Sequence, residues 1–293
     1  MENAAGMDPI RTLLPGDGTF PAALIGIPAP PASLRLRGEL GAPVARVAIV
    51  GAREADEYGR DMARRLARGL ARAGVSVVSG GARGIDAEAH QGALEAGGHT
   101  VAVLASGVDL PSPQLNRLLF ERILEAGGAL LSEYDDGTPV RDFRLVERNR
   151  LVSGLSDAVV VVRAGRSSGA LITAALARAQ HRPLLAVPGD ADHPLSEGPL
   201  RLLREGARLA ATPADVLHCL GLAPGQQAEL PLAELAPASR DLLGALTLSP
   251  RHLAEVARAA GLPTGAALAG LLTLELDGLC EQRPGQRFVR RSL

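Results

Sequence analysis

Six apolar segments of strand length recur between residues 45 and 190, and they constrain the fold of this 293-residue chain more than any other feature. They show no regular alternation with polar residues, which is typical of strands buried on both faces. Helix-length stretches separate nearly all of them, and this alternation predicts an α/β fold with a doubly wound parallel sheet. The apolar segments are 47–50, 75–78, 100–104, 129–131, 158–162 and 183–187. The expected helices are 56–73, 85–96, 114–126 and 168–180.

Changes in composition divide the chain into four parts. Residues 1–44 are rich in proline and glycine and are expected to form an irregular N-terminal arm or entry segment, ahead of the sheet domain at 45–220. Residues 221–238 contain three prolines with weak periodicity, which indicates a linker. Residues 239–293 resemble a small winged-helix-like domain, in which three helices precede a hairpin. Those helices are expected at 241–248, 250–260 and 264–281.

Charge and composition exclude several classes of protein. The net charge is −1, so any site that binds an anion must be a local feature of the surface. Because the chain has no lysine, the contacts to that anion must come mainly from arginine side chains or from the backbone. Two tyrosines, four phenylalanines and no tryptophan argue against a surface built from rows of stacking rings. The two cysteines, Cys219 and Cys280, favour a reducing cytoplasm. We find no signal peptide and no apolar run long enough to span a membrane.

The stretch from Val77 to Leu94 carries the most specific local pattern. It predicts a buried strand, a turn GGARG, and a helix that begins at Ile85. Such a turn leaves backbone N–H groups and the positive end of a helix dipole facing an anion. Arg83 adds a permanent charge whose planar fork suits a phosphate group.

The turns that follow parallel strands lie at one edge of the sheet, where ligands of such folds bind. This edge is expected to form a cleft lined by glycine turns and arginines, with Glu147 and its neighbours close by. The residues expected there are Gly51, Arg53, Ser79, Gly80, Gly81, Arg83, Gly84, Ser106, Gly107, Arg148, Asn149, Arg150, Ser168 and Gly169.

Other readings of these motifs remain open but are less favoured. Ser167 occupies a literal G-x-S-x-G match, although no acid and histidine arrive on separate strand ends to complete a hydrolase. Asp86 and His90, four residues apart, could hold a metal ion. More commonly, an aspartate in the first turn of a helix is stabilised by the helix dipole, and His90 would then pair with Asp86 or pack in the core. Arg148 and Arg150 could form structural ion pairs with Glu147, Asp142 or Asp157. The dinucleotide and P-loop fingerprints are absent. We therefore expect no catalytic residue, no metal and no cofactor.

The ordered set of motifs resembles the DprA (Smf) family of bacterial DNA-processing factors. It comprises VAIVGAR, YG, VVSGGARGIDAEAHQGAL, TVAVLASGVD, LLSEY, RNRLVSGLSDAVVVV, SGALITAALA, AVPGD and LLREGA, and the resemblance covers residues 19–217. It implies an extended Rossmann-like domain that binds single-stranded DNA as a homodimer, protects incoming strands in natural transformation and helps load the RecA recombinase. No catalytic reaction is implied.

The resemblance also implies particular roles for residues. Phosphate contacts would come from Arg53, from Arg83 with the amides of Gly80 and Gly81, and from Arg148 and Arg150. The Gly169 turn would form another side of the pocket. Where the family usually has the motif GSR, this chain has GAR, with Ala52 in place of the serine. It also has Leu145 where the family tends to have a second aromatic residue, so Phe143 is the remaining candidate for stacking on a base.

Two other functions compete with DNA binding. A small-nucleotide enzyme similar to phosphoribohydrolases would also place glycine turns around its ligand, but RSSGALITAA has alanine and leucine where a catalytic acid would help. The third is an interaction protein whose winged helix binds protein rather than duplex DNA.

Overall fold

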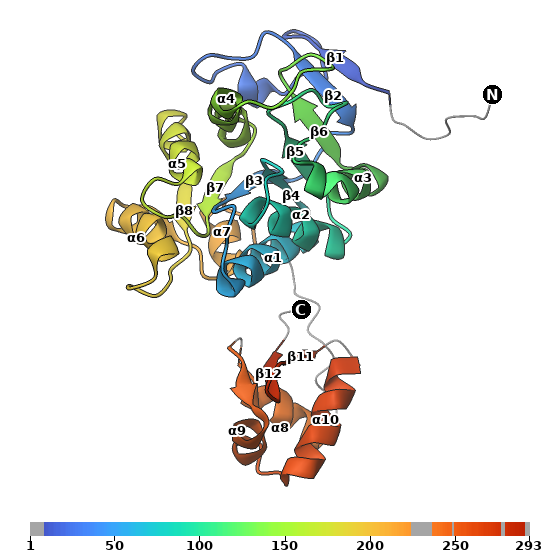
Figure 1. Ribbon diagram of the computed structural model, residues 1–293, viewed down its shortest axis with the longest axis vertical. Coiled ribbons are helices and arrows are strands. Elements are labelled where there is room, and N and C mark those ends of the chain that lie inside the picture. The colour runs from blue at the N-terminus through green and yellow to red at the C-terminus, as the bar shows by residue number, and fades with distance from the viewer. Residues whose placement is uncertain (1–8, 224–235, 248, 277–278, 291–293) are drawn as a thin grey trace, which may run out of the picture. The chain divides into compact units, whose positions relative to one another are not determined.

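The computed structural model describes residues 9–223, 236–247, 249–276 and 279–290 and divides into two compact units (Figure 1). The first unit runs to Gly225, and the second begins at Gln226. Most of the linker expected at 221–238 lies outside the described residues. Within the described residues, no helix is both long and apolar enough to cross a membrane.

A nine-stranded sheet forms the centre of the first unit, in the order β1-β2-β6-β5-β4-β3-β7-β8-β9. The seven strands from β6 to β9 in this order are parallel, which confirms the predicted sheet. The strands are β1 (Arg11–Leu13), β2 (Leu34–Gly38), β3 (Ala45–Val50), β4 (Val75–Ser79), β5 (Thr100–Val103), β6 (Ala129–Ser132), β7 (Ala158–Val161), β8 (Leu184–Ala186) and β9 (Arg208–Leu209).

Helices cover both faces of this sheet (Figure 1). One face carries α1 (Glu57–Arg72), α2 (Ile85–Glu95), α3 (Arg117–Glu125) and α7 (Pro213–Cys219). The other face carries α4 (Asp142–Gly154), α5 (Gly169–Ala179), α6 (Glu197–Arg204) and the short helix η1 (Ala22–Leu24). Two further short helices are η2 (Gln114–Asn116) and η3 (Pro194–Ser196).

Burial on both faces explains why the strands read as continuous apolar runs. In β3, Val47 and Ile49 pack under α1 and α2, whereas Ala48 and Val50 face the opposite layer. Successive side chains of a strand point to opposite faces, so every position of a covered strand must be apolar.

The expected irregular arm contains two strands of the large sheet, so the prediction was wrong for residues 11–13 and 34–38. Strand β2 pairs antiparallel with β6, with Leu36 opposite Leu131, and β1 pairs with β2. Its sequence LRLRG alternates buried leucines with half-buried arginines. This pattern belongs to a strand with one fully covered face, so it lacks the continuous apolar run that marks the central strands. Helix α4 was also missed, because its sequence was read only as a polar cluster before a strand.

The second unit confirms the predicted winged-helix domain. Helices α8 (Pro237–Ala245), α9 (Leu253–Ala259) and α10 (Thr264–Leu276) pack with a sheet of β10 (Arg251–His252), β11 (Cys280–Arg283) and β12 (Arg287–Arg290). Phe288 and Leu271 are fully buried in its core. Helix α10 is shorter than the expected 264–281, because residues 280–283 pair with β12.

Candidate nucleic-acid interface

Strand order reverses direction between β3 and β7, which are hydrogen-bonded neighbours in the sheet. The chain proceeds from β3 toward β6 on one side and from β7 toward β9 on the other. The turns after β4, β3 and β7 therefore adjoin one another at the carboxyl edge, where ligands of doubly wound sheets bind. The topology brings the predicted glycine turns to this common edge.

The glycine turn after β4 already holds a carboxylate of the chain itself. The N–H groups of Gly80 and Ala82 donate to Asp86 Oδ2 at 3.1 and 3.4 Å. The Gly80 amide therefore has an internal partner, which differs from the expected amide contact with phosphate. Asp86 is 7% exposed, and its burial raises the pKa of the carboxyl, against the opposing charge of Arg148.

Arg148 lies beneath the same turn, not on the surface. Its side chain projects from α4 and donates through Nη1 to the carbonyl oxygens of Gly80 and Val103. Only 4% of Arg148 is exposed, and burial lowers the pKa of its guanidinium. A Cβ atom added to Gly80 would lie 2.6 Å from Arg148 Nη1, so the turn requires glycine at this position. The structure thus assigns Arg148 a supporting contact with the turn, and direct phosphate contact does not fit its burial.

Other predicted residues on α4 lie in different surroundings. Arg150 forms a two-contact ion pair with Glu133, at 2.8 Å from Nη1 to Oε1, and not with the acids that the sequence suggested. Asn149 is half-buried, and Phe143 is 55% exposed. The guanidinium of Arg144 lies 5.4 Å from the Phe143 ring centre and 5.1 Å from that of Tyr134. The exposed ring remains available to a ligand.

Several predicted glycine and serine residues shape the edge from within. Ser79 Oγ donates to the Ile49 carbonyl, and Ser106 Oγ donates to that of Leu110. Added Cβ atoms would collide with Ile85 at Gly51 and with Asp109 at Gly107. These four positions therefore build the turns and are not exposed contact groups.

Helix α5 begins at the open part of the edge. Ser168 caps it by accepting the N–H of Ala170 at 3.3 Å. Gly169 is exposed, and a Cβ atom placed there would meet nothing within 4 Å. The backbone of Gly169 is thus accessible, and its contact with a ligand stays a prediction.

A pocket of about 650 Å³ opens where the N-terminal parts of α1 and α2 meet the carboxyl edge. It brings together the predicted residues Arg53, Arg83 and Gly84, and both arginine side chains are exposed. Gly81 underlies the turn, against the buried ring of Phe120. The pocket is lined by Arg53, Glu54, Ala55, Asp56, Arg60, Arg83, Gly84, Ala87, Glu88, Gln91, Leu115, Asn116, His193 and Leu195.

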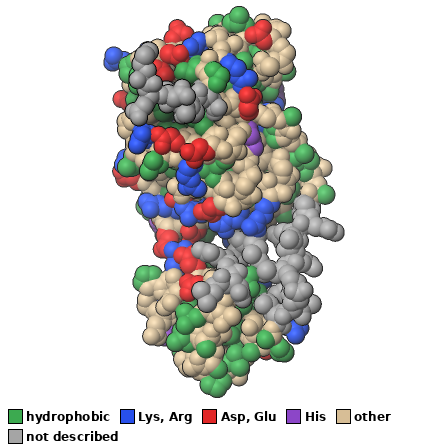
Figure 2. Space-filling view, turned by 90° about the vertical axis from the view of Figure 1, so that its right-hand side faces the viewer, with side chains coloured by type: hydrophobic (Ala, Val, Ile, Leu, Met, Phe, Trp, Pro, Cys, Tyr) green, Lys and Arg blue, Asp and Glu red, His purple; other side chains and the backbone are tan. Residues whose placement is uncertain are grey.

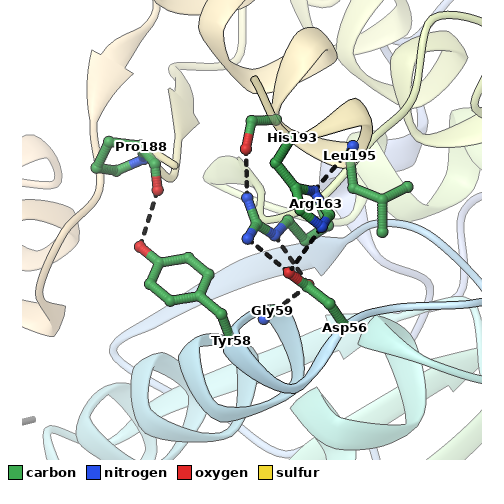
Figure 3. A network of polar contacts seen from close by, with 8 residues as sticks. Asp56, Tyr58, Gly59, Arg163, Pro188, His193 and Leu195 are labelled. Carbon is green, nitrogen blue, oxygen red and sulfur yellow. Dashed lines mark hydrogen bonds and ion pairs between the residues drawn. The ribbon is translucent and has the colours of Figure 1, made fainter. Parts of the chain in front are cut away.

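A buried ion pair supports one wall of this pocket (Figure 3). Arg163 follows β7, is 2% exposed, and donates to Asp56 from Nε at 3.0 Å and from Nη2 at 2.7 Å. Burial alone would raise the pKa of Asp56, but these bonds hold it below its ordinary value. Arg163 also donates to Ser196 and stacks 4.5 Å from the ring centre of Tyr58. His193 Nε2 lies 3.5 Å from Asp56 Oδ2. This network ties α1, the end of β7 and residues 193–196 together.

Sequence reasoning missed Arg60, Asp56, Arg163 and His193 as parts of this region. Arg60 precedes Arg64 by four residues and belongs to the same line of arginines along α1. The four-residue spacing could have identified Arg60, because the first arginine of this series on α1 lies nearest the carboxyl edge of the sheet. Arg64 instead pairs with Glu88, at 2.9 Å from Nε to Oε2. On the face in Figure 2, basic side chains lie among acidic ones, in keeping with a local anion site.

Within the described residues, no three histidine, cysteine, aspartate or glutamate side chains gather as a metal site would require. Within the described part of the chain Asp86 and His90 share no hydrogen bond, because His90 Nδ1 bonds Thr100 Oγ1 at 2.7 Å and Asp86 accepts from the Gly80 and Ala82 amides.

Comparison with known families agrees with this arrangement. The family model for DNA recombination-mediator protein A matches residues 11–221, and that for the DprA winged helix domain matches residues 226–286. The chain belongs to the DprA family. The DprA match covers both units that the structure separates.

Relatives from three bacteria match between 59% and 72% of this chain. Protein Smf of Escherichia coli is 40% identical over 214 residues, which are 72% of this chain and 57% of that protein. DNA processing protein DprA of Bacillus subtilis is 34% identical over 211 residues, 71% of each chain. The match to the putative DprA of Mycobacterium tuberculosis spans 44% of that protein, so the chain matches about half the length of several such relatives.

Two solved DprA structures have the same fold. DNA processing protein A of Streptococcus pneumoniae has a TM-score of 0.66 and 34% identity, over 71% of this chain and 74% of that one. The protein from Helicobacter pylori, described by its single-stranded DNA binding mode, has a TM-score of 0.64 and 30% identity. That match covers 73% of this chain and 96% of the other.

Proposed function

We propose that this DprA protein binds single-stranded DNA without sequence preference at the carboxyl edge of its large sheet. The observation that carries the proposal is the pocket in which Arg53 and Arg83 lie together at the point where strand order reverses. Guanidinium groups bind phosphates through charge and paired hydrogen bonds, and such contacts carry no sequence information. The H. pylori relative, described as binding single-stranded DNA, supports the same ligand here.

The DNA strand would meet three kinds of group at this edge. Arg53 and Arg83 supply positive charge, and the accessible backbone at Gly169 permits a close approach. Phe143 offers an exposed ring for an unstacked base. Arg148 and Asp86 act indirectly, because they bind the carbonyl and the N–H of Gly80 and so hold the turn in place.

Family membership supports the remaining parts of the proposal. The protein acts as a homodimer in the cytoplasm, protects single strands and helps load RecA on them during natural transformation, with no catalytic reaction of its own. Light scattering on the purified chain tests the dimer. RecA strand exchange on strands coated with single-strand binding protein tests loading: addition of the chain is expected to shorten the lag.

Fluorescence anisotropy with a labelled dT strand and a matched duplex, over a series of salt concentrations, tests DNA binding. We expect the strand to bind more tightly than the duplex, with affinity that falls as salt rises. Arg53→Glu and Arg83→Glu should each weaken binding at least about tenfold, because each reverses a charge beside the phosphates. Arg72→Glu is the matched control, since Arg72 is exposed at the far end of α1.

Equal affinity of wild type, Arg53→Glu and Arg83→Glu would move the DNA site elsewhere. No binding of the strand by wild type at low salt would refute the proposal. Release of a free base from a nucleoside monophosphate would then favour the phosphoribohydrolase-like alternative.

A further inference from the structure

The pocket holds a third arginine and an exposed leucine that the proposed DNA contacts leave unused. Arg60 lies on the first turns of α1 and lines the pocket together with Arg53 and Arg83. Leu115 also lines the pocket and is 77% exposed. An exposed apolar side chain beside three cations is the combination that a nucleotide requires, since a nucleotide carries a charged phosphate and an apolar base face.

The charge balance of the pocket favours an anion. Three acids line it, but Asp56 is bound by Arg163 and Glu88 is bound by Arg64. Glu54 is the acid that remains, against the three arginines. The Arg60 side chain is exposed, and within the part of the chain that the structure describes it forms neither a hydrogen bond nor an ion pair; the backbone N–H of Arg60 is bound to the Asp56 carbonyl. Its guanidinium is therefore available to a ligand.

Polar groups near Leu115 add directional contacts. Gln91 accepts a bond from Arg64 through Oε1 at 2.6 Å, which leaves the hydrogens on Nε2 for an acceptor. Asn116 donates through Nδ2 to the carbonyl of Gly81 at 2.9 Å and so fixes the segment that carries Leu115 to the glycine turn. The apolar wall is thus held at a set position relative to Arg83.

We infer that this pocket binds one unstacked nucleotide of the DNA strand, with its phosphate on Arg60 and its base against Leu115. The inference rests on the proposed DNA binding and extends it to α1. The phosphate comes either from the interior of the strand or from its 5′ end. A pocket of about 650 Å³ lies within the range of about 300–1,000 Å³ usual for small-molecule sites.

The test uses the full chain with dT strands of about 16 nucleotides, the upper range for a single-strand site. Arg60→Ala is expected to weaken binding at least about tenfold, the cost of one charged contact, and to lower the slope of log affinity against log salt by about 0.7. Leu115→Ala is expected to weaken binding about fivefold with an unchanged salt slope, because it removes stacking area and no charge. Arg72→Ala, on the same helix, should change neither quantity.

Strands with a 5′-hydroxyl and a 5′-phosphate distinguish the two sources of phosphate. If the 5′-phosphate raises the affinity of wild type but not that of Arg60→Ala, the pocket holds the strand end. If both strands bind wild type equally and both weaken in Arg60→Ala, it holds an interior phosphate. Either result supports the nucleotide site.

Unchanged affinity and salt slope in Arg60→Ala, while Arg53→Glu loses binding, would overturn this inference and leave the proposed function standing. A loss of affinity in Leu115→Ala accompanied by a change in salt slope would overturn the assignment of the base to Leu115. Failure of wild type to bind any strand would remove the proposed function itself.

Discussion

Arg148 and Asp86 bind the backbone of the same residue, Gly80, from helices on opposite faces of the sheet. Arg148, on α4, donates to the carbonyl of Gly80, and the Gly80 N–H donates to Asp86, on α2. The two side chains carry opposite charges and are both buried, so each offsets part of the cost of burying the other. The position of the glycine turn at the carboxyl edge therefore depends on residues that a DNA strand does not touch.

Replacement of Arg148 by methionine should lower the free energy of unfolding by about 3–5 kcal/mol at pH 7, because it leaves the Asp86 carboxylate buried without its counter-charge. Burial raises the pKa of Asp86 above 3.8 in the folded protein. A proton bound to Asp86 removes the unpaired charge, so the penalty should shrink as pH falls from 7 toward 4. Urea unfolding of wild type and Arg148→Met between pH 7 and pH 4 measures this penalty in unfolding free energy. An equal penalty at every pH would contradict the coupling.

His90 should make the protein less stable in mild acid. Thr100 Oγ1 donates to the Val77 carbonyl, so His90 Nδ1 must donate to Thr100, and Nε2 is a buried acceptor. Burial lowers the pKa of His90 from 6.5 to about 3. Below pH 6.5, His90 therefore binds a proton in the unfolded chain but stays neutral in the folded protein. The free energy of unfolding should fall by about 1.4 kcal/mol per pH unit below 6.5 and level off near pH 3.

The variant His90→Leu isolates this contribution. The difference in unfolding free energy between wild type and variant should change between pH 6.5 and 4.5 in favour of the variant, as measured by urea unfolding. A difference that stays constant with pH would show that His90 is not kept neutral by burial.

Arg163→Met should destabilise the first unit by about 3 kcal/mol, since it breaks a largely buried ion pair and frees Asp56, which caps α1. Thermal unfolding of the full chain measures the loss. Gly189→Ala should act in the same direction, because its Cβ would lie 2.2 Å from Arg163 Nη1. Gly244→Ala is the control, because its added Cβ atom meets no neighbour within 4 Å. Gly206→Ser would not serve, because the φ of +92° at Gly206 is strained for serine. A stable Arg163→Met protein would show that the network in Figure 3 contributes little.

Gly169→Ala should separate binding from stability. The added methyl group meets no protein atom within 4 Å, and alanine favours a helix more than glycine does, so the melting temperature should not fall. The methyl group would occupy space through which the strand passes, so affinity for a dT strand should decrease. Gly265→Ala, in the first turn of α10, is the matched control. Unchanged affinity would place the strand away from α5.

The central strands and the glycine turns could be predicted because their causes are local. A strand covered on both faces must be apolar throughout, and a turn that closes on another backbone must lack a side chain, as Gly84 does against the Ala52 carbonyl. Strand β2 escaped prediction because its pairing with β6 is decided by residues far along the chain. The sequence contains several apolar strands beside which the leucines of β2 could lie, and only the folded sheet shows that β2 lies beside β6.

The direction of arginine side chains could not be read from the sequence. Arg83 and Arg148 both stand beside the predicted cleft, yet Arg83 is exposed and Arg148 is 4% exposed. The difference arises because α4 packs on the face opposite α1 and α2 and brings Arg148 beneath the turn. Arg163 was missed for a related reason: it follows an apolar strand, and its partner Asp56, at the start of α1, is 107 residues away in the sequence.

The antiparallel pairing of β2 with β6 sets an order for assembly during synthesis. Leu36 leaves the ribosome early, but its partner Leu131 follows only after β3, β4 and β5 have been made. Through that interval β2 presents an apolar row and unpaired backbone groups, the features that nascent chains expose to chaperones. The attachment of β2 to the rest of the sheet thus waits for β6, and a pause in translation before residue 132 would prolong the exposure of a strand made near the beginning.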